Sequence, residues 1–197
     1  MGFLEVLTGA SPVRLAVKGL ALLAIVLAAA SPQAAAQDSG ESLEAPIKAT
    51  FLYRFADFIS WPAEAFPSPA TPVRICIIGE DPFGVLLDRM VEEQTAAGRP
   101  LSVHRLHRIG RDSGCHVAYL SGSGYQSVAD GLAASGETPV LTVTDSAAGD
   151  EARGVIHFEV IDNRVRFHVD DMQATRHGLK VSSRLLGIAV SVRRTDT

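Results

Sequence analysis

Short apolar runs separated by helical segments constrain the fold of this chain more than any other feature. The runs have the length of strands and lie at 73–79, 100–106, 115–122 and 139–145. Between them, 81–93 and 124–134 are predicted to be helical, and Asp81 and Pro82 suit the start of the first. Strands that alternate with helices indicate βα units. We therefore predict an α/β fold, with a mostly parallel central sheet flanked by helices on both faces.

The segment 154–170 differs, because it consists of two alternating runs around Asp162-Asn163. This pair suits a tight two-residue turn and predicts a C-terminal antiparallel β-hairpin. Pairing Ile161 with Arg164 fixes the register. One face is then apolar and is expected to be buried; it carries Ile156, Phe158, Val160, Val165, Phe167 and Val169.

The other face of this hairpin is expected to be solvated, with Glu159 opposite Arg166 as a cross-strand ion pair. His157 and His168 face each other there, and Asp170 lies diagonally near. Two imidazoles and a carboxylate can hold zinc. The sequence offers no second shell for such a site, so we expect a solvated histidine pair and neither metal nor cofactor. A mild response to pH is the remaining alternative.

Half of the twelve aromatic residues lie in a short stretch that begins with an amphipathic pattern at 48–60. On a helical wheel one side is apolar, with Ala49, Phe51, Leu52, Phe55, Ala56, Phe58 and Ile59. Tyr53 falls on the polar side, and Trp61 follows the predicted end of the helix. We predict that the phenylalanines anchor the helix, and that Tyr53 and Trp61 bind a partner. In the alternative, Trp61 folds under the proline-rich connector 64–72 and Tyr53 only covers surface.

The N-terminus has the pattern of a cleavable secretory signal at 1–36. Basic Arg14 and Lys18 precede an apolar run at 19–30, and three alanines end at Ala36, where we place the cut. The apolar run is too short to span a bilayer, although a retained anchor is the alternative. We therefore expect export, into a bacterial periplasm.

The rest of the chain is expected to hold one domain at 47–192, after a flexible segment at 37–46 and before a tail at 193–197. From residue 37 onward it has 16 basic and 21 acidic side chains, a net charge of −5. No basic stripe stands out, which argues against binding of nucleic acid.

Several residues at predicted strand ends are candidates for a site. Gly79, Ser121, Gly122 and Ser123 could line a ligand pocket, because open α/β sheets bind ligands at the carboxyl ends of their strands. The turn 79–84 lacks the lysine of a phosphate-binding loop and carries two acidic residues instead. The segment 121–125 follows a predicted strand as a nucleophile elbow does, with Asp145 and His157 downstream, but Ser121 occupies the position where the elbow needs its first glycine. We predict no enzyme.

The two cysteines, Cys76 and Cys115, belong to predicted strands. In an exported domain they are expected to form a disulfide, which neighbouring strands would allow. Two buried thiols are the alternative.

Eight segments in order resemble the YfiR family of exported proteins (the DUF4154 domain). They are KATFLYRFADFISWP, ICIIGEDPFG, GRPLSVHRL, CHVAYLSG, PVLTVTD, GVIHF, VRFHVD and GLKVSSRLL. The resemblance spans about 43–192 and implies an α/β sandwich that is often dimeric. Cys76 and Cys115 match the usual disulfide of the family, whereas a second cysteine pair of some members is absent. His157 and Asp170 stand where asparagines are expected.

The resemblance also implies a function. It indicates a periplasmic repressor that binds the periplasmic sensor of an inner-membrane diguanylate cyclase and lowers cyclic-di-GMP signalling. An OmpA-like outer-membrane lipoprotein can sequester such a repressor. The alternative function is a periplasmic small-ligand binding module with its pocket at the carboxyl ends of the strands.

Overall fold

The computed structural model describes residues 43–194, and the signal segment predicted at 1–36 lies outside this range. The helices are α2 (Glu44–Arg54), α3 (Val85–Val91), α4 (Val128–Ser135), α5 (Asp171–Arg176) and α6 (Ser183–Ile188), with 3-10 turns η1 (Phe55–Phe58), η2 (Ala63–Ala65), η3 (Arg111–Ser113) and η4 (Ser146–Ala148). The strands are β1 (Ile59–Ser60), β2 (Val73–Gly79), β3 (Thr95–Ala96), β4 (Arg99–Leu106), β5 (Val117–Gly122), β6 (Leu141–Asp145), β7 (Ile156–Ile161), β8 (Arg164–Asp170), β9 (Lys180–Val181) and β10 (Ser191–Arg193).

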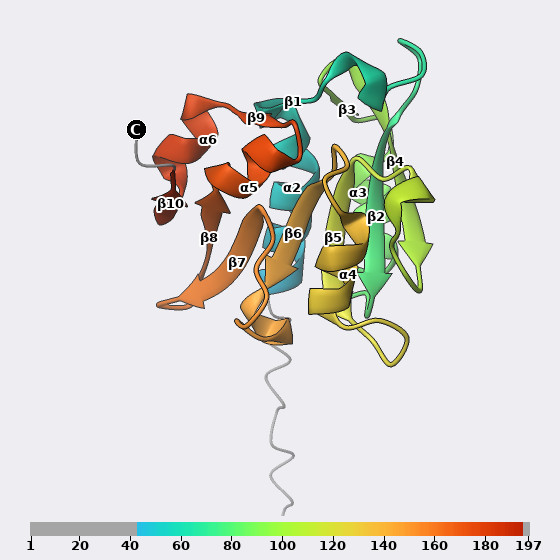
Figure 1. Ribbon diagram of the computed structural model, residues 1–197. Coiled ribbons are helices and arrows are strands. Elements are labelled where there is room, and N and C mark those ends of the chain that lie inside the picture. The colour runs from blue at the N-terminus through green and yellow to red at the C-terminus, as the bar shows by residue number, and fades with distance from the viewer. Residues whose placement is uncertain (1–42, 195–197) are drawn as a thin grey trace, which may run out of the picture. The chain divides into compact units, whose positions relative to one another are not determined.

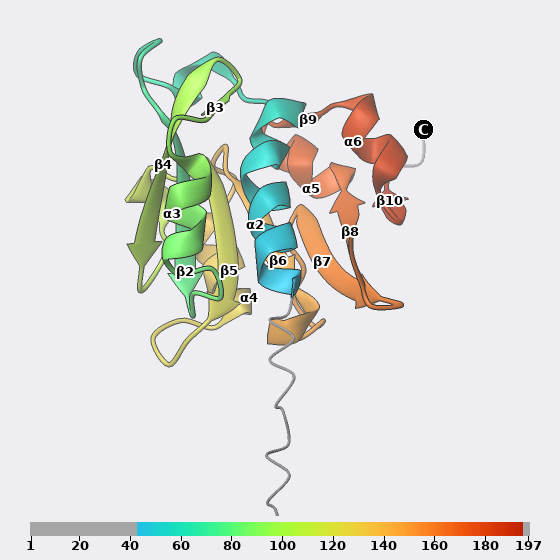
Figure 2. The same cartoon turned by 180° about the vertical axis from the view of Figure 1, so that it is seen from behind.

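Eight strands form one mixed, mostly parallel sheet in the order β10-β8-β7-β6-β5-β2-β4-β3. The neighbouring strands β4, β2, β5, β6 and β7 are all parallel, and β7 pairs with β8 in antiparallel orientation. Figures 1 and 2 show α4 on one face of the sheet and α2 with α3 on the other. The chain therefore has the α/β fold with a mostly parallel sheet that its sequence predicts.

The hairpin forms in the predicted register, with Ile161 opposite Arg164. Asp162 and Asn163 both have positive φ, 50° and 57°, as a two-residue turn of this kind requires. The predicted cross-strand ion pair is wrong, although Glu159 does lie opposite Arg166. Its carboxylate instead lies 2.6 Å from Nε2 of His168.

Each face of the sheet carries its own apolar core. The larger core joins the apolar side of α2 to Leu87 of α3 and to the inward side chains of strands β2, β5, β6, β7 and β8. The smaller core lies on the opposite face around the two cysteines, and Val128 and Leu132 of α4 pack against it. Two covered faces explain why β2, β5 and β6 are apolar at nearly every position.

The first helix differs from the helix predicted at 48–60. It begins at Glu44, inside the segment 37–46 that was expected to be flexible, and its α-helical part ends at Arg54. One tighter 3-10 turn follows, after which Ile59 is extended and pairs with Val181. This pairing with a distant strand ends the helix before Trp61.

The second helix is also shorter than the predicted 81–93, because α3 begins at Val85. Asp81 does not cap it. Its carboxylate accepts hydrogen bonds from the backbone N–H groups of Phe83 and Gly84, and it pairs with Arg105 at 2.7 Å. The acidic residue therefore fixes the turn that precedes the helix. Ser182 does cap a helix, since its hydroxyl accepts from the N–H of Leu185 at the start of α6.

Candidate functional site

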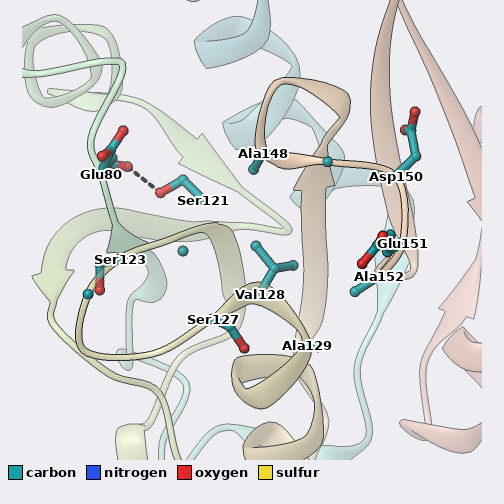
Figure 3. A pocket seen from close by; sticks show the side chains of 13 residues that line it. Glu80, Ser121, Ser123, Ser127, Val128, Ala129, Ala148, Asp150, Glu151 and Ala152 are labelled. Atoms are coloured by element: carbon teal, nitrogen blue, oxygen red, sulfur yellow. Dashed lines mark hydrogen bonds between the residues drawn. The ribbon is translucent and has the colours of Figure 1, made fainter.

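A cavity of about 760 Å³ lies beyond the carboxyl ends of β2 and β5, between the first turn of α4 and the connection from β6 to β7. Ser121, Ser123 and Ser127 contribute hydroxyl groups to its lining. Figure 3 shows Glu80 on one side and the 148–152 segment, with Glu151, across from it. Hydroxyl and carboxylate oxygens dominate the polar lining, which fits recognition of a polar ligand.

The residues predicted to line this site behave in two ways. Ser121, Gly122 and Ser123 do line the cavity, whereas Gly79 does not. Gly79 has a φ of 93°, and a Cβ on it would lie 2.2 Å from the carbonyl oxygen of Gly122. This glycine allows two backbone segments to approach each other closely.

Ser121 has a structural hydrogen-bonding role at the wall of the cavity. Its hydroxyl lies 3.0 Å from the carbonyl oxygen of Ile78 and also contacts that of Glu80. In the hypothetical triad the serine would be Ser123, whose hydroxyl accepts from the N–H of Tyr125 at 3.1 Å. The other two members also have partners elsewhere, Asp145 with Lys48 and His157 with Thr144 and Asp150. These contacts do not form a nucleophile with its base.

A buried polar cluster fixes the start of the connection from β6 to β7. Nζ of Lys48 lies 2.5 Å from Oδ2 of Asp145, and both side chains are less than 5% exposed. The Tyr119 hydroxyl donates to Asp145 at 3.1 Å, and the N–H of Ala147 donates to its other oxygen at 2.9 Å. Burial raises the pKa of Tyr119, so its phenol stays neutral and can donate. Lys48 also contacts Glu44 one turn earlier.

This cluster joins α2 to the wall of the cavity, and it was not predicted from the sequence. The available signal was Lys48, a charge beside Leu52 within the apolar arc of the helical wheel. A charge in such a position needs a buried partner. The sequence does not show which of the many acidic residues supplies it.

His157 fixes the middle of the same connection. It is 2% exposed, so the prediction of a solvated histidine pair is wrong. Nε2 lies 2.9 Å from the Asp150 carboxylate, and Nδ1 lies 2.9 Å from the hydroxyl of Thr144. A carboxylate only accepts, so Nε2 carries the proton and Thr144 donates to Nδ1. Burial lowers the pKa of His157, which keeps the ring neutral.

His168 lies across the hairpin, with its ring centre 6.4 Å from that of His157. Its nitrogens contact Glu159 and Ser191, at 2.6 and 2.7 Å. Within residues 43–194, no group of three or more His, Cys, Asp and Glu side chains has a geometry that could hold a metal ion. Asp170 caps α5 by accepting from the N–H of Gln173.

The aromatic stretch is more buried than its wheel predicts. Tyr53 is only 9% exposed, so its predicted position on the polar face is wrong. The reason is α3, which lies against α2 and widens the covered arc of that helix. Phe51 and Phe55 pack on Phe158 and Phe167 of the hairpin, as anchors of the helix would.

Trp61 is half-buried and packs edge-on against Phe66 of the proline-rich connector, with ring centres 5.9 Å apart. Its Nε1 is buried without a hydrogen-bond partner in the described part of the chain. The connector is held in place by Arg99, whose guanidinium lies over the ring of Phe66, and by His116, which stacks on the other side. Trp61 therefore folds back under the connector, as the alternative interpretation expects.

Cys76 and Cys115 form the predicted disulfide, with their Cα atoms 5.8 Å apart. It joins the middle of β2 to the residues just before β5, on the α4 side of the sheet. This is the smaller core, so the bond stabilises the face with less apolar packing.

The model of one protein family matches residues 45–190, and its description is YfiR/HmsC-like. The chain belongs to the YfiR/HmsC-like family. The match covers nearly all of the residues that the structure describes and agrees with the family that the eight ordered segments indicate. Among curated proteins, none is similar enough to count as a match. Within residues 43–194, no helix combines the length and the apolar character needed to cross a membrane.

Proposed function

We propose that this member of the YfiR/HmsC-like family is a non-catalytic periplasmic regulator. It binds the periplasmic sensor domain of an inner-membrane diguanylate cyclase and holds the enzyme inactive, so that cyclic-di-GMP signalling falls. The observation that carries the proposal is the family match over residues 45–190, because this family is associated with regulation of diguanylate cyclases.

Two features of the chain support export. The N-terminal segment 1–36 has the composition of a cleavable signal, and the single disulfide suits an oxidising compartment. The cavity also fits a protein without catalysis, since Ser123 accepts from the N–H of Tyr125, and Asp145 and His157 are paired with other residues.

Further partners belong to the same proposal. A second copy of the chain would form a dimer, and an OmpA-like outer-membrane lipoprotein would sequester the repressor and release the cyclase. Trp61 keeps part of its surface exposed and remains our proposed contact with a partner, whereas Tyr53 is too well covered to offer much surface.

Deletion of the gene in its host tests the proposal. Cellular cyclic-di-GMP should rise, and the full-length chain should restore the original level. A version that begins at residue 37 should stay in the cytoplasm and fail to restore it. Purified chain should also bind the purified periplasmic domain of the cyclase. Unchanged cyclic-di-GMP together with no binding would refute the proposal.

The cavity favours a second candidate function, a periplasmic small-ligand binding module. A cavity of about 760 Å³ is within the usual range for small-molecule sites. Gly124 lines it and has open space around the position of a Cβ, so Gly124→Trp should fill the cavity without strain. Gly187→Trp, on α6 and also without crowding, is the matched control.

A screen of polar metabolites by thermal shift separates the two functions. A ligand that stabilises the wild type and Gly187→Trp but not Gly124→Trp would establish the binding module. Repression of the cyclase by Gly124→Trp at the wild-type level would show that the regulator works without this cavity.

A further inference from the structure

The outer edge of β4 is open over most of its length. The strand runs from Arg99 to Leu106, but its outer neighbour β3 pairs with it only at Arg99 and Pro100. From 101 to 106, no strand lies beside this edge within the part of the chain that the structure describes. Both views place β4 at the margin of the sheet (Figures 1 and 2). Such an edge presents unpaired backbone N–H and C=O groups to a further strand.

Proteins usually prevent unwanted strand pairing at an open edge with a charged side chain, a proline or a β-bulge. Here Pro100 stands at one end of the open part and Arg105 at the other. Arg105 is occupied, since it binds Asp81 at 2.7 Å and Asp88 at 2.6 Å. Leu101, Ser102 and Val103, the three residues after Pro100, carry neither a charge nor a proline. The most apolar part of the edge therefore has neither a charged side chain nor a proline to prevent the addition of a strand.

A groove of about 610 Å³ runs along this same part of the edge, between β4 and α3. Val91 of α3 and the half-buried Leu101 and Val103 of β4 supply its apolar lining. Leu101 and Val103 lie opposite Val73 and Ile75 of β2, so both side chains point to the face that α3 covers. An open edge beside a helix, with an apolar groove between them, is the geometry by which proteins bind an extended peptide as an added strand.

The rim of the groove defines the charge of its occupant. Asp88 is neutralised by Arg105, and Arg89 is exposed nearby. Glu92 and Glu93, both exposed, follow at the end of α3, so the rim has an excess of negative charge. A positively charged side chain on the occupant would complement this end.

We propose that the β4 edge binds an extended segment of another protein by strand addition. The segment has apolar side chains at alternate positions, which enter the groove against Leu101 and Val103, and a lysine or arginine at the end near Glu92 and Glu93. This surface is separate from the strand-end cavity, and it does not depend on the proposed regulation of a cyclase.

The test uses the disulfide-bonded chain and a displayed library of random peptides of about ten residues, the length of a long strand. Enriched peptides should share alternate apolar positions and a basic residue at one end. Bound peptide should slow hydrogen exchange of alternate backbone amides within 101–106. Two sets of peptides should be compared, one methylated on the backbone nitrogens of the odd positions and one on those of the even positions. One set should lose binding and the other should keep it, because only one edge of an added strand forms hydrogen bonds with β4.

Charge reversal on the protein supplies the matched comparison. The double variant Glu92→Lys and Glu93→Lys should weaken binding of the basic peptides about tenfold. The control, Glu64→Lys with Glu137→Lys, makes the same change of net charge at exposed positions outside the groove lining and should bind like wild type.

Several outcomes would overturn the proposal. The first is a library that yields no peptide able to protect amides in 101–106. The second is equal binding of peptides methylated at odd and at even positions. The third is an equal loss of binding in both double variants. Protection of the same amides by rising protein concentration alone would assign the edge to a second copy of this chain instead.

Discussion

Replacing Lys48 by methionine is expected to lower the free energy of unfolding by about 3 kcal/mol, because it leaves the buried Asp145 without its cation. Removal of one member of a buried ion pair costs about 3–5 kcal/mol. We expect the lower end of this range here, because the hydroxyl of Tyr119 and the N–H of Ala147 still donate to the carboxylate. Methionine keeps most of the aliphatic volume of lysine, so the loss reports on charge and not on a cavity.

Two further variants isolate the interaction. Lys48→Met combined with Asp145→Asn removes both charges and keeps an acceptor for Ala147, so it should recover most of the loss. Lys180→Met, at an exposed position on β9, is the matched control and should stay within about 0.5 kcal/mol of wild type.

Urea unfolding at neutral pH with the disulfide intact measures these differences, and calorimetry should show a melting temperature about 6–12 °C lower for Lys48→Met. A loss below about 1 kcal/mol would mean that water reaches the cluster, so that Asp145 is not desolvated as its 3% exposure indicates. A double variant no more stable than the single one would show that the two charges are not coupled.

Three other perturbations have defined outcomes. Phe55→Ala should destabilise the fold by about 3–5 kcal/mol in urea unfolding, since this ring is 1% exposed in the larger core, and a loss of less than about 1 kcal/mol would contradict that packing. Reduction of Cys76–Cys115 should lower the free energy of unfolding by about 4 kcal/mol for a loop of this length. The intact mass of the exported protein should show two hydrogens fewer than the dithiol form. Two alkylatable thiols in native material would contradict the bond. Burial lowers the pKa of His116 and of His157, so the unfolded chain binds protons more readily than the folded protein. The free energy of unfolding should therefore be highest above about pH 7 and should fall as the pH drops through about 6.5. Equal urea midpoints at pH 7.5 and 5 would contradict this.

Local patterns in the sequence determined the elements and several of their contacts. The register of the hairpin followed from Asp162-Asn163, because a two-residue turn leaves one pairing of the flanking strands. The disulfide followed from compartment and strand order, since only two cysteines are available. Strand alternation with helices likewise predicted the mostly parallel sheet.

The candidate site was predictable only in part. Ser121, Gly122 and Ser123 line the cavity because the carboxyl ends of parallel strands lie at one edge of the sheet. Gly79, at an equivalent strand end, is instead used for close backbone approach to Gly122. A glycine in the sequence does not reveal which of these two uses it has, because both exploit its missing side chain.

Only the tertiary structure decided the burial of individual polar residues. Tyr53 is covered because α3 lies against α2, and His157 is covered because the segment after β6 folds over it and brings Asp150 to its Nε2. Lys48 is buried because Asp145, almost a hundred positions away, lies at the end of the strand beneath it. A helical wheel or a strand alternation describes one element alone, whereas burial depends on which other elements pack beside it. The sequence therefore determined what forms along the chain, and the packing between elements determined which of its polar groups lie inside.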